Sequence, residues 1–348
     1  MIDYRVERRI TKGRTAPCLW EPISLDKYKV KKPIMICLGG IYTTSESIAD
    51  AYANMMSNLI GADEQVDVLT IIYSSDVESK KGDLTPKQVS EVVRNLLIQT
   101  VMGENYKPLP LEQAKKGMRR INFATYCHGA RVVLQKIENE LRYQLLNKKY
   151  SPEEVNDLLS QVFVVEYAGR TKHSSMSTFR INSLTDEVFG KEYCADYFEK
   201  IVKDRIKNDF LGKKKIEEAE TSESKKESLC NRMMRKSKYS LLLKDNGMFL
   251  YTNAITKGND HNLKGLKRDT SWKVERGKVT RKGDVVSQCM GYALAYGMAN
   301  SVLNEYSEEL IPLDMTMLQH DCESVLSQMK RGSKTGEKTE SQEMALRG

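Results

Sequence analysis

The feature that most constrains the fold is the alternation of short apolar runs with amphipathic helical patterns. Short apolar runs bounded by turn residues are typical of buried strands, and their alternation with helical patterns indicates a mostly parallel sheet. The expected strands are Pro33–Leu38, Val66–Tyr73, Ile121–Tyr126, Val162–Tyr167, Phe179–Leu184 and Met248–Ile255, and the expected helices are Ser45–Leu59, Pro86–Val101, Ala130–Leu146, Pro152–Leu159 and Val285–Leu303. We therefore predict an α/β fold with a single, mainly parallel sheet and helices on both faces.

The remaining segments are assigned around this domain, which we expect over residues 31–305. Residues 1–30 are expected to form one or two antiparallel edge strands. Residues 190–246 include the charge-dense stretch Lys203–Lys238, and we expect a mainly helical, basic insertion or cap there, before the last strand. Residues 306–330 are expected to form a helical extension, and the tail 331–348, rich in Lys, Glu, Ser and Gly, is expected to be disordered.

One junction between an expected strand and an expected helix carries a reactive side chain, Cys127. It follows the run Ile121–Tyr126 directly, so the chain must turn sharply there, and Gly129 would let the helix pack close to the strand. This is the layout of a nucleophile elbow, in which a strained turn exposes the side chain above the sheet edge. Thr125 occupies the upstream position at which glycine is commonest. The alternative reading is a buried, inert thiol at the end of a strand.

The loop after the strand Pro33–Leu38 contains Gly39, Gly40 and Ile41. In α/β-hydrolases this loop gives one backbone N–H to the oxyanion hole, and the residue after the nucleophile gives the other. The donors here would be the amide of Gly40 or Ile41 and the amide of His128. The same glycines could instead form a simple turn, or cradle a phosphate before the next helix.

An acidic residue and a histidine follow Cys127 in the chain. Asp186 comes just after the expected strand Phe179–Leu184, and His261 lies in a polar stretch after the strand Met248–Ile255. The order of nucleophile, acid and histidine is that of the α/β-hydrolase triad. Glu166, near the end of Val162–Tyr167, is the alternative acid.

With these features the chain resembles the α/β-hydrolase superfamily over roughly residues 30–305, and it is similar to members with a cysteine at the elbow, such as dienelactone hydrolases and polyester synthases. The resemblance implies a catalytic triad of Cys127, His261 and Asp186. It further implies a cysteine-dependent hydrolase or acyltransferase that acts on an ester, thioester or amide through an acyl-Cys intermediate. It does not imply a particular substrate.

Composition bounds the other classes of function. The seven cysteines are dispersed and include no C-x-x-C pair, which indicates free thiols and argues against a disulfide framework and against a metal site. The first residues are charged and no apolar run reaches membrane-spanning length, so we expect a cytoplasmic protein without a transmembrane segment. Neither G-x-x-x-x-G-K-[ST] nor G-x-G-x-x-G follows the first strand, and we expect no cofactor.

The net charge of +8 is concentrated in two stretches. Ile201–Gly247 holds 13 Lys and Arg against 8 Asp and Glu, and Lys257–Lys282 holds 9 against 3. A basic surface favours a small-molecule or acylated substrate that is anionic, although it is also typical of a solvated face. Aromatic residues do not alternate with the basic ones, so nucleic acid is not expected as a partner. A non-catalytic binding or effector module of the same fold is the alternative function.

Overall fold

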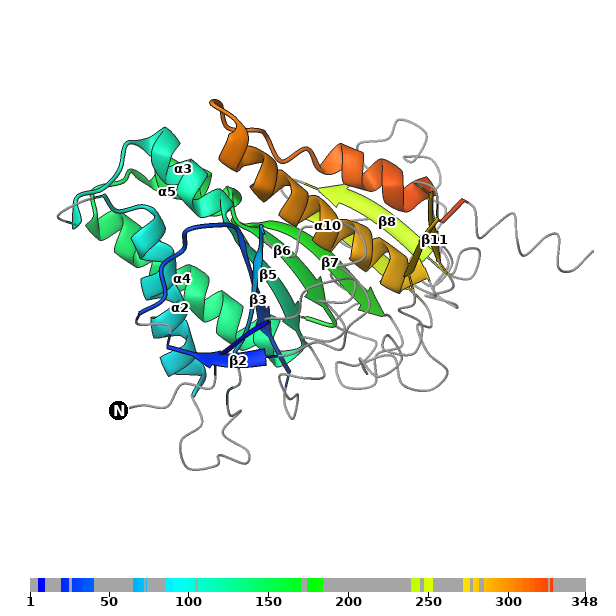
Figure 1. Cartoon of the computed structure of the whole chain (residues 1–348), viewed down its shortest axis with the longest axis horizontal. Coiled ribbons are helices and arrows are strands. Elements are labelled where there is room, and N and C mark those ends of the chain that lie inside the picture. The colour runs from blue at the N-terminus through cyan, green and yellow to red at the C-terminus, as the bar shows by residue number, and fades with distance from the viewer. Residues whose placement is uncertain are drawn as a thin grey trace, which may run out of the picture.

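The computed structural model contains a nine-stranded sheet with six parallel strands at its centre (Figure 1). It describes residues 6–9, 20–24, 27–40, 65–71, 73, 85–103, 106–169, 174–183, 239–244, 247–252, 272–275, 278–281, 285–324 and 326–327. The strand order is β2-β1-β4-β3-β5-β6-β7-β9-β8. The parallel strands are β4 (Asp67–Ile71), β3 (Ile34–Leu38), β5 (Ile121–Tyr126), β6 (Phe163–Tyr167), β7 (Ser177–Ser183) and β9 (Gly247–Thr252).

Antiparallel strands close both sides of this parallel block. β1 (Val6–Arg9) pairs antiparallel with β4 and with β2 (Trp20–Ile23). β8 (Tyr239–Lys244) pairs with β9 at the other edge. A separate antiparallel pair is formed by β10 (Trp272–Glu275) and β11 (Lys278–Arg281).

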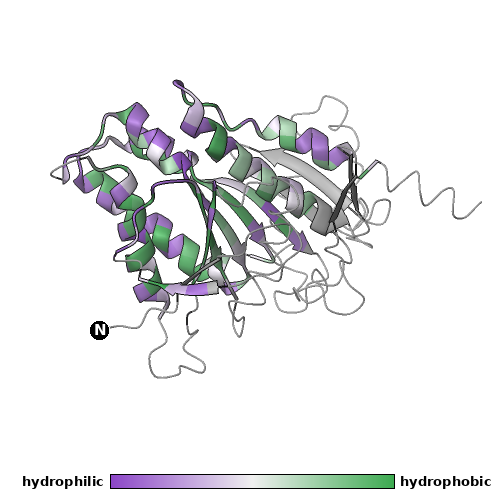
Figure 2. Ribbon diagram, viewed as in Figure 1, coloured by the Kyte–Doolittle hydropathy of each residue, from purple (hydrophilic) through white to green (hydrophobic). Residues whose placement is uncertain are grey.

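Helices cover both faces of the sheet, as predicted (Figure 1). One face packs against α2 (Pro86–Thr100), α3 (Leu111–Arg119), the π-helical turn η2 (Gly129–Leu134), α4 (Gln135–Asn147) and α5 (Pro152–Ser160). The other face packs against α10 (Val285–Tyr306) and a helical segment over residues 315–324. Figure 2 shows the central strands mostly green and the surrounding helices carrying both green and purple residues, as expected for strands that are buried on both faces.

The main differences from the sequence prediction are elements that it missed. The helix α3 is short and polar on most of its surface, with Ala114, Gly117 and Met118 among its buried residues. The strand β8 falls in the range 190–246 that we expected to be an insertion, but it belongs to the main sheet. The pair β10 and β11 falls in a stretch for which we expected no strand. The expected helix Ser45–Leu59, the stretch Lys203–Lys238 and the tail 331–348 lie outside the described residues.

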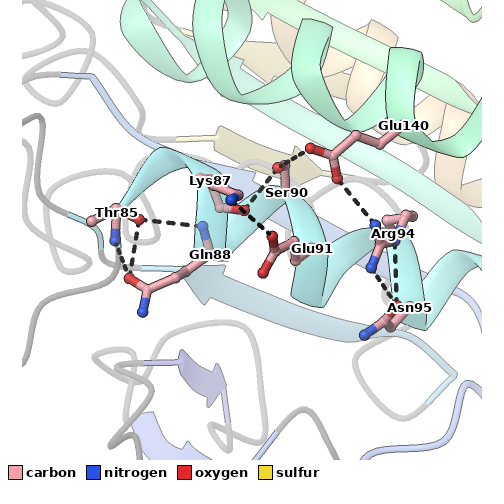
Figure 3. A network of polar contacts seen from close by, with 8 residues as sticks. All are labelled: Thr85, Lys87, Gln88, Ser90, Glu91, Arg94, Asn95 and Glu140. Atoms are coloured by element: carbon pink, nitrogen blue, oxygen red, sulfur yellow. Dashed lines mark hydrogen bonds and ion pairs between the residues drawn. The ribbon is translucent and has the colours of Figure 1, made fainter.

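Helix α2 begins at Pro86, as expected, and Thr85 is its N-cap (Figure 3). The Thr85 hydroxyl accepts a hydrogen bond from the Gln88 backbone N–H at 3.3 Å, and the Gln88 side chain accepts one from the Thr85 N–H at 2.9 Å. This capping box satisfies two backbone donors that the first helical turn leaves unpaired. Further along, Glu140 of α4 accepts from Ser90 at 3.2 Å and pairs with Arg94 at 3.4 Å, which ties α2 to α4.

Helix α10 approaches the sheet closely at Gly297 and Ser301. A Cβ atom on Gly297 would lie only 2.3 Å from the ring of Phe163 on β6 and 2.9 Å from Oδ1 of Asn122 on β5. Nearby, Ser301 accepts from the Asn122 side chain at 2.9 Å and donates to the Arg119 carbonyl at 2.7 Å. These contacts fix the position of α10 over β5 and β6.

We predict that Gly297→Ala destabilises the protein by about 2 kcal/mol or more, because the added methyl group overlaps the Phe163 ring and overpacks the core. Helix propensity alone would give the opposite sign, since alanine is favoured over glycine in a helix by about 1 kcal/mol. Urea unfolding of the variant and the wild type measures the difference. Gly103→Ala is the matched control: its methyl group would meet only the tip of the Leu109 side chain, at 3.0 Å, and that side chain can move. Equal or increased stability of Gly297→Ala would contradict the described packing.

Candidate functional site

Cys127 lies in a strained turn at the carboxyl end of the central strand β5. Its backbone φ is 50°, in the left-handed region that non-glycine residues seldom adopt. Its N–H donates to the Tyr167 carbonyl of β6 at 3.1 Å, and the side chain is 7% exposed. His128, the next residue, already has helical backbone angles, so the chain turns from strand to helix at Cys127. The strand, turn and helix of a nucleophile elbow are therefore present at the predicted residue.

Gly129 brings the helix that follows the elbow against the end of β3. A Cβ atom at this position would lie 2.5 Å from the carbonyl oxygens of both Leu38 and Gly39. Only glycine fits so close an approach of two backbone segments. The sequence prediction for Gly129 is confirmed. The first turn after the elbow is the π-helical η2, a local geometry that is frequent at functional sites.

The glycine loop after β3 lies directly beside Cys127. A Cβ atom on Gly40 would be 3.0 Å from the Cβ of Cys127 and 3.0 Å from the Tyr126 ring. A substrate carbonyl bound at the thiol would thus meet the backbone of this loop with no intervening side chain at Gly40. Ile41, the other expected donor in the loop, lies outside the described residues.

Tyr73, beyond the end of β4, joins the site although sequence analysis gave it no role. Its hydroxyl donates to the Gly39 carbonyl at 2.5 Å and lies 3.3 Å from Nδ1 of His128. The Tyr73 and His128 rings are stacked, with centroids 5.9 Å apart. Burial raises the pKa of Tyr73 well above its usual value, and the nearby Cys127 raises this pKa further, so the phenol keeps its proton. In the sequence Tyr73 stands at the carboxyl end of an expected strand, but this position does not show which strand lies beside it.

The turn after β6 completes the described part of the site. Ala168 also has a positive φ, of 49°, and its N–H donates to the Ile181 carbonyl of β7 at 2.9 Å. A Cβ atom on the next residue, Gly169, would lie 2.6 Å from the Cβ of Ala130 in η2. Three neighbouring strand ends, those of β3, β5 and β6, therefore meet around the elbow.

Glu166, the alternative acid, is buried on β6 and pairs with an arginine. Its Oε2 lies 3.6 Å from Nε of Arg180 on β7, and the two side chains are 1% and 5% exposed. The two residues are direct neighbours in the β6–β7 register, so the sheet itself brings the charges together. An acid held in this way compensates a buried cation, a role that needs no catalytic function. Asp186 and His261 lie outside the described residues.

A hollow of about 800 Å³ lies at the opposite end of the sheet, beside the end of α2. Lys29, Lys31 and Arg120 are among its lining residues. Arg120 precedes β5 whereas Cys127 follows it, and six strand residues separate the two by ~20 Å. This hollow is therefore separate from the candidate site. No His, Cys, Asp or Glu cluster in the described ranges could hold a metal ion, and no helix in those ranges is long and apolar enough to cross a membrane.

This chain is similar to several solved structures, but it matches no known protein family. No protein-family model matches the sequence, and no curated protein matches it. The structure of a carboxylesterase from Bacillus cereus can be aligned with this chain at a TM-score of 0.29 and 11% sequence identity. The alignment covers 56% of this chain and 77% of the carboxylesterase chain. The structure of a carboxylesterase from Lactobacillus plantarum WCFS1 aligns at a TM-score of 0.30 and 14% sequence identity, over 57% of this chain and 78% of the carboxylesterase chain. The fold assignment rests on the sheet order and on the turn at Cys127.

The strain at Cys127 predicts an unusual order of stabilities. Cys127→Gly should be more stable than Cys127→Ala by about 1 kcal/mol, because a Cβ atom is disfavoured at positive φ and glycine is not. At Ala130, in the helical turn η2, Ala130→Gly should instead lower stability, since glycine is unfavourable in helices. Urea unfolding of the three variants checks both signs. If Cys127→Gly proved the less stable of the Cys127 pair, the turn would not be strained.

The buried pair predicts a second stability result. Glu166→Ala should destabilise the protein by about 3–5 kcal/mol, because it removes the buried carboxylate that pairs with Arg180. The double variant Glu166→Ala, Arg180→Met should recover much of that loss, since it removes both charges. Thermal or urea unfolding of Glu166→Ala, Arg180→Met and the double variant measures the recovery as a double-mutant cycle. Additive losses in the double variant would show that the pairing contributes nothing.

Proposed function

We propose that this chain is a cysteine-dependent hydrolase or acyltransferase that acts on an ester, thioester or amide through an acyl-Cys127 intermediate. The observation that carries the proposal is the strained turn at Cys127, at the carboxyl end of a central parallel strand, with the Gly40 backbone against its Cβ. Strain of this kind costs about 1–3 kcal/mol, and it persists at sites where it serves function.

In the proposed mechanism the Cys127 thiolate attacks the substrate carbonyl. His261 takes the thiol proton, and Asp186 holds the imidazole in the correct tautomer. The carbon–sulfur bond forms as the carbonyl π electrons move onto oxygen, and the amides of Gly40 or Ile41 and of His128 stabilise the resulting oxyanion. Return of the electron pair expels the alcohol, thiol or amine, which takes the proton from His261. Water or another acceptor then releases the acyl group.

The positions of β7 and β9 support these two partners. Both strands run parallel to β5, so Asp186, three residues after Ser183, and His261, nine residues after Thr252, follow strand ends at the edge that holds Cys127. In the sheet, β7 is the second strand from β5, at a distance of ~10 Å, and β9 is the third, at a distance of ~15 Å. Extended segments of three and nine residues span up to ~10 Å and ~30 Å, so both side chains can reach Cys127. Asp186 is preferred over Glu166 as the acid because Glu166 already pairs with Arg180.

The substrate class follows from chemistry and charge. A thioester intermediate reacts readily with amines, so transfer to an amine competes with hydrolysis. The two basic stretches, Ile201–Gly247 and Lys257–Lys282, flank the strand that leads to His261 and favour an anionic acyl substrate. We therefore propose a small or acylated substrate that carries negative charge.

The decisive test is selective chemistry at one thiol. Limited iodoacetamide should alkylate Cys127 ahead of the other six cysteines, as measured by peptide mass spectrometry, because a thiol activated by a neighbouring base reacts faster than an ordinary thiol. Cys127→Ala should lose all turnover of acyl thioesters and p-nitrophenyl esters while it keeps the wild-type unfolding midpoint. Cys127→Ser should retain at most a small fraction of the activity.

Cys37→Ala is the matched control, since Cys37 is fully buried on β3. It should keep both turnover and selective labelling at Cys127. Uniform labelling of all accessible thiols, with no turnover of any acyl substrate, would contradict the proposed enzymatic function. That result would favour the alternative, a non-catalytic binding or effector module of the same fold.

A further inference from the structure

The Tyr73 hydroxyl contacts both segments that would supply oxyanion donors. It donates a hydrogen bond to the Gly39 carbonyl, which belongs to the same peptide group as the Gly40 N–H. It also contacts the ring of His128. A tyrosine hydroxyl has one proton to donate, and here that proton is on the bond to Gly39. Tyr73 therefore cannot donate at the same time to a substrate oxygen. The 3.3 Å contact with His128 is satisfied when Nδ1 carries the imidazole proton and donates to the phenol oxygen.

The bond to Gly39 has a direct effect on the next peptide group. A trans peptide is planar, so the Gly39 carbonyl and the Gly40 N–H point in opposite directions and rotate together. Two consecutive glycines restrict this rotation very little, because they lack the side chains that limit φ and ψ. A hydrogen bond on the carbonyl therefore fixes the direction of the N–H. That peptide lies against Cys127, as the 3.0 Å between the Cys127 Cβ and a Cβ atom on Gly40 shows.

We propose that Tyr73 is a positioning residue whose hydroxyl holds the Gly39–Gly40 peptide so that the Gly40 N–H faces the oxyanion formed on a Cys127 adduct. This inference rests on the proposed function and names a part of the same site that the triad does not include. Since burial keeps the phenol protonated, the hydroxyl stays a donor throughout the working pH range. Tyr73 should accordingly add no ionisation to the pH profile of kcat/KM.

The test compares two reactions of the same thiol in Tyr73→Phe. Alkylation by iodoacetamide is a displacement at saturated carbon and forms no oxyanion. A trifluoromethyl ketone accepts the thiolate at its carbonyl carbon and forms a hemithioketal, whose oxygen carries the charge. We expect Tyr73→Phe to weaken trifluoromethyl ketone binding by roughly tenfold to a hundredfold, somewhat less than loss of an oxyanion donor itself. The alkylation rate should change less than about twofold, and kcat should fall while KM changes little.

Tyr150→Phe is the matched control. Tyr150 is a buried tyrosine whose hydroxyl also donates to a backbone carbonyl, that of Leu109 at 2.8 Å, and it lies near the end of α2 at the opposite end of the sheet. It should leave both reactions at their wild-type values. Unchanged ketone binding in Tyr73→Phe would overturn the proposal, and so would an equal fall in both reactions, which would mean that Tyr73 acts on the thiol itself.

Replacement of Tyr73 by fluorotyrosine keeps the hydroxyl and remains informative if Tyr73→Phe does not fold. It should bind the ketone as tightly as the wild type, and a tenfold loss would overturn the inference. The proposed function fails in a different way, which is visible without any Tyr73 variant. In that case the wild-type protein would show neither selective alkylation of Cys127 nor binding of the ketone.

Discussion

The contact on which the candidate site depends is the backbone approach between Gly129 and the end of β3. The carbonyl oxygens of Leu38 and Gly39 occupy the space that a side chain at position 129 would need. Because η2 starts there, this contact determines how sharply the chain can leave β5, and it holds Cys127 at positive φ. The Gly39 carbonyl at this contact also accepts the hydrogen bond from the hydroxyl of Tyr73. A larger residue at position 129 would separate the elbow from the glycine loop.

The parallel pairing of β3, β5 and β6 supplies the frame for this contact. Leu38 is paired with Thr125, and Tyr126 with Tyr167, so three strands end at the same level. Turns with positive φ follow β5 and β6, at Cys127 and Ala168, and the glycine pair Gly39 and Gly40 follows β3. Carboxyl ends of parallel strands are where ligands bind in open α/β sheets, because the connecting loops there can converge. Burial on both faces keeps the frame rigid: β3, β5 and β6 consist entirely of buried residues.

The sequence predicted the parts of the fold that have a strong local pattern. Several strands of the parallel block, such as β3, contain short apolar runs, and α2 has both an N-cap threonine and a proline at its first position, so these elements were found to within a few residues. The elbow was found because a strand, a cysteine and a glycine are adjacent in the chain. β8 was missed because its three leucines lie beside a lysine-rich stretch that reads as an exposed helix.

Tyr73 could not be assigned for a different reason. Its role depends on which strands are neighbours, and the strand order β4-β3-β5 is not encoded in any local pattern. Once β4 lies beside β3, a residue two positions beyond its end is level with Gly39, 34 residues earlier in the chain. The same holds for Glu166 and Arg180, whose pairing follows from the β6–β7 register and gives an acid near the site a structural partner. The order of the strands thus determines which polar side chains lie close to the turn at Cys127.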